Sequence, residues 1–247
     1  KPLEGLLAPH LGLYWDRIKA DYPGCQEKPP LAPVVESFGG EREAAVALST
    51  VPPLPRIWFI HREESEVIQI QRDRILHNWK KVRMDDSYPR YEHVIHQFKE
   101  NFAVLGEFLE EHRLGRMIPV QCEMTYLNQI ELGKPDEPLA DVGSVLPDFQ
   151  WRKLPGRFFG IPESFAWRTT FPLPDQAGRL HITMQAGARR QDGIPLLLLD
   201  LTARGLAQEH SQGALWRWFD LAHEWIVRGF ADLTSEELQR DSWNRIG

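Results

Sequence analysis

The fold is predicted from residues 56–81, RIWFIHREESEVIQIQRDRILHNWKK, in which a short apolar run precedes a second run rich in Ile and Val. The connection between the two runs is charged and contains no Gly or Pro. An amphipathic segment from Tyr88 to about Arg113 follows directly. This order is typical of two antiparallel strands that lead into a helix packed across them.

A similar order of segments occurs in the second half of the chain. Arg179–Met184 and Leu196–Ala203 are predicted as strands, and Leu215–Phe230 as the helix behind them. Leu196–Leu201 is apolar on both faces, which predicts a position inside the sheet. The helix is apolar almost all round, which predicts that it is buried. The predicted fold class is therefore α+β, with two tightly joined pseudo-repeated halves, residues 1–118 and 119–247, each an antiparallel sheet backed by a long helix.

The remaining segments are predicted from their periodicity and their breakers. Residues 1–22 have helical spacing and end before Pro23-Gly24, and the proline-rich residues 23–55 are predicted as a surface connector. Val120–Ile130 alternates cleanly between apolar and polar positions, which predicts a strand. Residues 131–171 are irregular and rich in Pro, Gly and aromatic residues.

The apolar side of the first predicted hairpin changes within its second strand. Ile68 and Ile70 fall on one face, whereas Ile75 and Trp79 fall on the other when the strand is counted with a period of two. This change predicts a β-bulge between Gln71 and Arg74, which would redirect Arg72 and Arg74.

Composition restricts the classes of function. The 247 residues carry a net charge of −6, from 29 Lys and Arg against 35 Asp and Glu, so a nucleic acid is disfavoured as the main partner. The short basic clusters at Arg72, Arg74 and Lys80-Lys81 keep a nucleic-acid role as a further alternative. Cys25 and Cys122 are too few for a disulfide framework or a zinc cluster. No apolar run is long enough to span a membrane and no signal peptide is present, which favours a cytoplasmic protein without a membrane partner.

Motifs for catalysis and metal binding are incomplete. His223-Glu224 would need a second His four residues on to resemble a zinc protease, and position 227 is Val. His93 and His96 lie one helical turn apart without a third ligand nearby. No phosphate-binding glycine loop and no nucleophile elbow occurs. The sequence therefore predicts no catalytic residues, no metal and no cofactor.

A weaker group of polar residues is predicted between the second sheet and its helix. Its members are the ligand-pocket candidates Tyr126, Asn128, His223, Glu224 and Arg228. Polar groups in apolar surroundings need partners, and the favoured interpretation is that they bond to one another, with Glu224 and Arg228 at i, i+4 spacing. Arg72, at the predicted bulge, is a further pocket candidate.

Aromatic residues are concentrated in the irregular segment. The interaction-loop candidates are Trp151, Phe158, Phe159, Phe165 and Trp167. Rings in a loop need shelter, either by folding back on the body of the protein, which is favoured, or against a partner.

Four segments carry a resemblance to a known family: IWFI…EVIQIQRDRILHNWKK, YPRYEHVIHQF, VQCEMTYLNQI and DLAHEWIVRGFADLTS. Over most of its length the chain resembles a sporadically distributed family of uncharacterised prokaryotic proteins of about this size. The resemblance implies a two-half α+β body and a further apolar strand ahead of the segment that starts here at Lys1. It implies no catalytic residues, and its patchy distribution would fit accessory genes such as those of defence loci.

The first functional hypothesis is a non-enzymatic accessory protein that engages another protein or a second copy of itself. The aromatic segment and the absence of a recognisable catalytic set lead to it. The alternative is a small-molecule sensor or an unrecognised enzyme, with a pocket between the second sheet and its helix.

Overall fold

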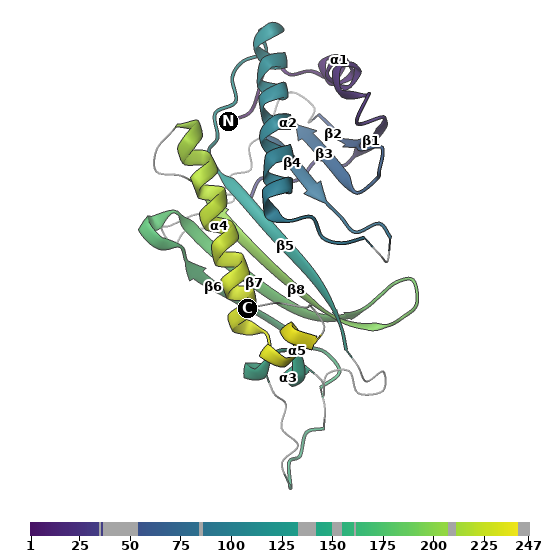
Figure 1. Cartoon of the computed structure of the whole chain (residues 1–247), viewed down its shortest axis with the longest axis vertical. Coiled ribbons are helices and arrows are strands. Elements are labelled where there is room, and N and C mark those ends of the chain that lie inside the picture. The colour runs from purple at the N-terminus through teal and green to yellow at the C-terminus, as the bar shows by residue number, and fades with distance from the viewer. Residues whose placement is uncertain are drawn as a thin grey trace. The chain divides into compact units, whose positions relative to one another are not determined.

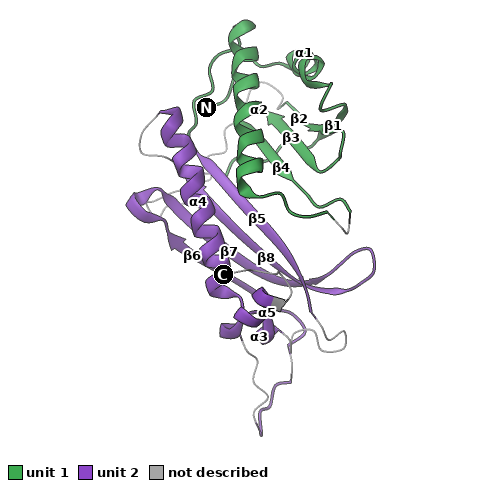
Figure 2. Cartoon of the chain, in the orientation of Figure 1, with its two compact units in different colours: residues 1–120 green, residues 121–247 purple. Residues whose placement is uncertain are grey.

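The architecture consists of two sheets, each with a long helix (Figure 1). This computed structural model describes residues 1–34, 36, 54–83, 86–132, 142–149, 155–160, 162–206 and 211–241. The chain divides into two compact units, residues 1–120 and 121–247 (Figure 2), whereas the predicted boundary lay after residue 118. Each unit holds a four-stranded antiparallel sheet, so the predicted α+β class with two sheet-and-helix halves is confirmed.

The described residues of unit 1 form two helices and one sheet with the strand order β1-β2-β3-β4. Its elements are α1 (Ala8–Ile18), β1 (Gly24–Lys28), β2 (Arg56–Ile60), β3 (Glu66–Gln71), β4 (Arg74–Trp79) and α2 (Tyr91–Glu111). All neighbouring strands are antiparallel. The helix α2 was predicted from its apolar stripe, and its bounds lie within the predicted segment.

The core of unit 1 lies between one face of this sheet and both helices. The register pairs Phe59 with Ile68, so these two side chains share a face. Tyr14 of α1 packs edge-to-face on Phe59 and on Phe108 of α2, with ring centroids 5.6 and 5.4 Å apart. All four residues are buried in one cluster. Burial of apolar area against a single sheet face is what holds α1 and α2 in place.

The predicted β-bulge is wrong, because a turn separates two strands at this point. Gln71 pairs with Arg74, and Arg72-Asp73 form the two-residue connection between β3 and β4. Ile70 pairs with Ile75, so both lie on the same face. The alternation was counted through the turn, which contains none of the Gly or Asn residues that usually mark a hairpin.

The proline-rich connector contains a strand that was not predicted. Gly24–Lys28 pairs with β2 at the edge of the sheet. Its sequence, GCQEK, shows no apolar alternation, and its three central residues are exposed. Backbone hydrogen bonding and not side-chain burial therefore fixes this edge strand.

Unit 2 contains the second sheet, with the strand order β5-β8-β7-β6. Its elements are β5 (Cys122–Glu131), α3 (Val142–Val145), the 3₁₀ turn η2 (Pro147–Phe149), β6 (Ala166–Pro172), the 3₁₀ turn η3 (Pro174–Gln176), β7 (Gly178–Ala188), β8 (Pro195–Gly205), α4 (Gln212–Leu233) and α5 (Glu236–Asp241). The interior position of β8 was predicted from its apolar sequence and is confirmed. The strand β6 lies inside the stretch that was predicted to be irregular, and there the prediction is wrong.

Helix α4 packs on the sheet of unit 2 through one face. The buried face includes Trp218, whose indole Nε1 donates a hydrogen bond to the Ala177 carbonyl at 2.8 Å. Arg217, Asp220 and Arg228 are exposed on the other side. The predicted burial on all sides is therefore wrong, because the helix is amphipathic and leaves charged residues in solvent.

The two units share a three-stranded meander that leads into a long helix. The shared order is β2-β3-β4-α2 in unit 1 and β6-β7-β8-α4 in unit 2. The fourth strand is added at opposite edges: β1 pairs with the first strand of its meander, whereas β5 pairs with the last. The internal repeat is thus limited to the meander and its helix.

Candidate functional site

Tyr126 and His223 are brought together by the packing of α4 on β5. The Tyr126 hydroxyl lies 3.0 Å from His223 Nδ1, and the two ring centroids are 5.9 Å apart. Both residues are partly buried. Side chains alternate between the two faces of a strand, and Tyr126 falls on the face of β5 that meets α4.

The other residues of the predicted pocket bond locally. Asn128 Nδ2 donates to the Leu199 carbonyl of the neighbouring strand at 3.4 Å. Glu224 and Arg228 form an exposed ion pair of 3.1 Å on α4, at the predicted spacing. These contacts are those of polar groups that satisfy one another, and the ligand-pocket hypothesis stays a prediction.

Arg72 belongs to the β3–β4 turn of unit 1, whereas the other candidates belong to unit 2. Its carbonyl accepts a hydrogen bond from the Leu3 amide at 2.8 Å, which ties the N-terminal segment to the turn. Arg72 therefore lies in a tight turn and not at the predicted bulge.

Part of the aromatic segment folds back on unit 2. Phe149 packs edge-to-face on Phe165 and Trp167, with centroids 5.7 and 4.8 Å apart. These three rings shelter one another beside β6, as predicted for the segment as a whole. Trp151 lies outside the described residues.

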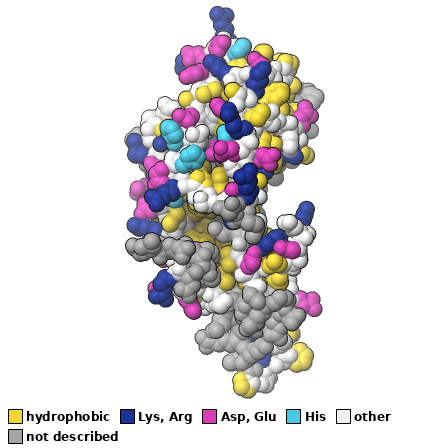
Figure 3. Space-filling model, turned by 45° about the vertical axis from the view of Figure 1, so that its right-hand side comes forward, with side chains coloured by type: hydrophobic (Ala, Val, Ile, Leu, Met, Phe, Trp, Pro, Cys, Tyr) yellow, Lys and Arg dark blue, Asp and Glu magenta, His cyan; other side chains and the backbone are white. Residues whose placement is uncertain are grey.

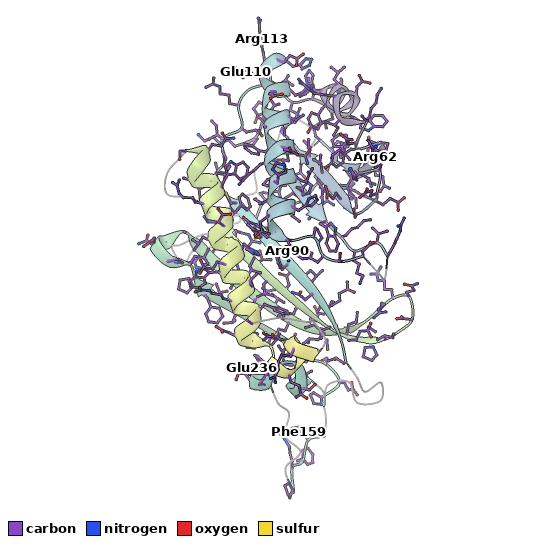
Figure 4. The ribbon with its side chains drawn as sticks, viewed as in Figure 1. Arg62, Arg90, Glu110, Arg113, Phe159 and Glu236 are labelled. Atoms are coloured by element: carbon purple, nitrogen blue, oxygen red, sulfur yellow. The ribbon has the colours of Figure 1, made fainter. Side chains whose placement is uncertain are left out.

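Phe158 and Phe159, here called the Phe pair, do not fold back. The two residues are 91% and 71% exposed, and their rings contact edge-to-face with centroids 5.2 Å apart. Figure 4 shows Phe159 at the tip of its loop, away from the strands of unit 2. Gly156, at φ +78°, supplies a backbone conformation in this loop that few other residues adopt.

A polar cluster that was not predicted lies between the sheet of unit 1 and α2. It is called the Glu66–His77 cluster and consists of Tyr22, Glu66, His77, His93 and Asn101. Glu66 Oε1 lies 3.1 Å from His93 Nε2, and Glu66 Oε2 lies 3.6 Å from His77 Nε2. Asn101 Nδ2 donates to the Tyr22 hydroxyl at 3.1 Å and lies 3.3 Å from His77 Nδ1.

Burial dominates the electrostatics of this cluster. The side chains of His77 and Glu66 are 1% and 12% exposed. Burial lowers the pKa of His77, while the neighbouring Glu66 carboxylate opposes that shift. Burial also raises the pKa of Tyr22 to about 12, so its phenol is protonated at neutral pH.

Two features of the sequence pointed to this cluster. Asn101 falls on the apolar stripe of α2, three residues after Phe98 and four before Leu105, where a polar residue needs a partner. His77 would have been placed on the core face with Ile68 if the Arg72-Asp73 turn had been recognised. His93 was interpreted only as half of a pair with His96, which instead contacts Glu100 at 3.2 Å.

Among the residues that the structure describes, no group of three or more His, Cys, Asp or Glu is arranged to hold a metal ion. No helix of the described chain has the length and apolar character needed to cross a bilayer.

The basic residues proposed for nucleic-acid binding differ in their surroundings. Arg74 contacts the Asp73 carboxylate at 2.9 Å, while Lys80 and Lys81 are exposed. Figure 3 shows Lys and Arg side chains interspersed with Asp and Glu. A phosphate backbone would meet alternating charges on that face.

No family model, no curated protein and no solved structure matches this chain. The resemblance to a sporadically distributed prokaryotic family accordingly stays a prediction.

Proposed function

We propose that the protein is a non-enzymatic binding module that engages another protein through the Phe pair. The observation that carries this proposal is the exposure of two adjacent phenylalanine rings, 91% and 71%, at the tip of a loop. Single exposed apolar residues are ordinary on protein surfaces, but two stacked rings at a tip offer one continuous apolar contact.

The energetics of the Phe pair fit an anchor. Burial of a phenylalanine side chain contributes about 1.5–3 kcal/mol. The two rings contact each other edge-to-face, with centroids 5.2 Å apart, so one pocket can accept both. Aromatic anchors that enter a pocket carry much of the affinity of protein interfaces.

The charge of the surrounding sequence indicates the chemistry of the partner. Arg152, Lys153 and Arg157 precede the Phe pair closely, and Glu163 is the nearest acidic residue after it. A partner with an apolar pocket rimmed by carboxylates would match both the rings and this positive charge. We therefore expect an interface whose aromatic centre excludes water and whose charged rim binds more weakly as the salt concentration rises.

The test compares the wild-type chain with a double variant, Phe158→Ser with Phe159→Ser, as bait in quantitative affinity capture from the native host. A matched control is Leu13→Ser, which removes an exposed apolar side chain from α1 in unit 1. The partner recovered with wild type is then purified and its affinity measured by calorimetry. We expect the double variant to bind at least about 30-fold more weakly, as loss of two anchors at 1 kcal/mol or more each implies.

The outcomes separate protein binding from other roles. Equal affinity of the wild type and the double variant for the purified partner would overturn the proposal. Basic residues next to aromatic rings also suit a membrane interface. The proposal would therefore be overturned as well if no protein bound the wild type directly and the Phe pair bound it to vesicles with anionic lipids.

A further inference from the structure

The imidazole of His77 is enclosed between β4 and α2 and is 1% exposed. Its ring faces Phe98 of α2, with centroids 6.5 Å apart. Solvent does not compensate a charge here, so the protonation state depends on fixed protein groups.

The two nitrogens of the ring have different surroundings. Asn101 Nδ2, which can only donate, lies 3.3 Å from Nδ1, so Nδ1 is the acceptor and the ring proton resides on Nε2. Nε2 lies 3.6 Å from Glu66 Oε2 and has no hydrogen-bond partner. In the neutral ring, Nδ1 therefore accepts a hydrogen bond, whereas Nε2 faces the Glu66 carboxylate without forming one.

Protonation of His77 would change both sides. A proton on Nδ1 would face the Asn101 amide, donor against donor, and break that contact. The charged ring would be drawn toward Oε2 of Glu66. The other oxygen of the same carboxylate, Oε1, lies 3.1 Å from His93 Nε2. Because His93 and Asn101 both belong to α2, a shift at His77 acts on two points of this helix.

The charged and titratable groups around His77 come from several elements. Glu66 on β3 favours the protonated ring, while His93 on α2 and His61 after β2 disfavour it. Burial is the largest influence and lowers the pKa of His77 below the ordinary histidine value. Tyr22 is hydrogen-bonded both to Asn101 and to Glu66, and it stays neutral.

We infer that the Glu66–His77 cluster is a proton-sensitive lock that holds α2 on the sheet of unit 1 at neutral pH and loosens it on acidification. As pH falls through the ordinary histidine pKa of about 6.5, the unfolded or opened chain takes up a proton before the closed one does. The closed state therefore loses stability as pH falls. The lock lies in unit 1 and does not depend on the Phe pair of unit 2.

The experiment follows histidine ring nitrogens by NMR and backbone amide exchange in the intact chain between about pH 5 and pH 8. At neutral pH we expect His77 to carry its proton on Nε2, and its pKa to lie below the ordinary histidine value. Amide exchange in the first half of α2 should rise on acidification, by up to about tenfold for each unit by which the pKa of His77 is lowered.

Two variants separate the lock from general acid sensitivity. His77→Gln keeps a donor toward Glu66 but cannot titrate, and its α2 exchange should depend less on pH than that of wild type. His96→Gln is the matched control, because His96 lies on the same helix and is exposed; it should behave as wild type. A proton on Nδ1 at neutral pH, or a His77 pKa at or above 6.5, would overturn the inference from the wild-type spectrum alone. So would an unchanged pH dependence in His77→Gln.

Discussion

The hydroxyl of Tyr126 lies 3.0 Å from Nδ1 of His223, and this contact joins β5 to α4 across 97 positions of the chain. It brings together two residues of the predicted pocket that belong to different elements. The contact links β5, at the edge of the second sheet, to α4, the helix that packs on this sheet.

This contact should be measurable as a coupling free energy. Tyr126→Phe removes only the hydroxyl and should lower the free energy of unfolding by about 1 kcal/mol. In a double-mutant cycle with His223→Gln, measured by urea denaturation, we expect a coupling of about 0.5–1.5 kcal/mol. Strict additivity of the two single variants would show that the hydrogen bond does not stabilise the fold.

The pairing of β7 with β8 depends on two glycines. Gly178 pairs with Gly205, and a Cβ at position 205 would overlap the carbonyl oxygen of Ala177. Because that atom is backbone, the overlap cannot be relieved by a change of rotamer. Gly205→Ala should therefore lower the free energy of unfolding by about 1–3 kcal/mol or more.

Gly187→Ala is the control for that substitution. It lies on the same strand pair, but a Cβ there meets nothing within 4 Å. Thermal denaturation of both variants should leave Gly187→Ala within about 0.5 kcal/mol of wild type. Equal losses in the two variants would contradict the close approach at position 205.

The two thiols should differ in reactivity. Cys122 is buried, and burial raises the pKa of its thiol to about 12, whereas Cys25 is exposed. Because the thiolate is the nucleophile, Ellman's reagent at mildly alkaline pH should modify one thiol in the native chain and two in denaturant. Cys25→Ser should show no fast reaction when native. Rapid modification of both thiols in the folded wild type would be inconsistent with the burial of Cys122.

The start of α4 is stabilised by a side-chain cap. Ser211 Oγ accepts a hydrogen bond from the Ala214 amide at 3.2 Å. Ser211→Ala should cost about 1 kcal/mol of stability, whereas Ser211→Asp should retain the cap and favour the positive end of the helix dipole. Equilibrium unfolding of the two variants measures the difference, and an aspartate variant as unstable as the alanine variant would exclude a capping role.

Periodicity predicted the elements that bury an apolar face. The alternation of apolar and polar residues up to Ile130 predicted β5. The apolar stripe predicted α2, and its residues Leu105, Phe108 and Leu109 are all buried. Such elements are predictable because the core requires each of them to present one apolar side. The strand β1 escaped prediction because it lies at an edge and buries little, so its sequence carries no such requirement.

The candidate sites were less accessible to prediction. The sequence identified Phe158 and Phe159 as members of an aromatic segment, but not which rings would be sheltered. Phe149, Phe165 and Trp167 pack together, whereas the Phe pair stays in solvent. The exposure of a ring depends on which side chains the fold brings next to it. When these side chains are distant in sequence, the local sequence pattern does not reveal them.

By itself, the sequence determined the α+β class, the two sheet-and-helix halves, the long helices and the interior position of β8, because periodic burial leaves a local record in the chain. Only the tertiary structure decided the turn at Arg72-Asp73, the different edges at which β1 and β5 join their sheets, and the meeting of Glu66, His77 and Asn101. Those features arise from pairing and packing between segments far apart in sequence, where the free energy belongs to the contact and not to either segment alone.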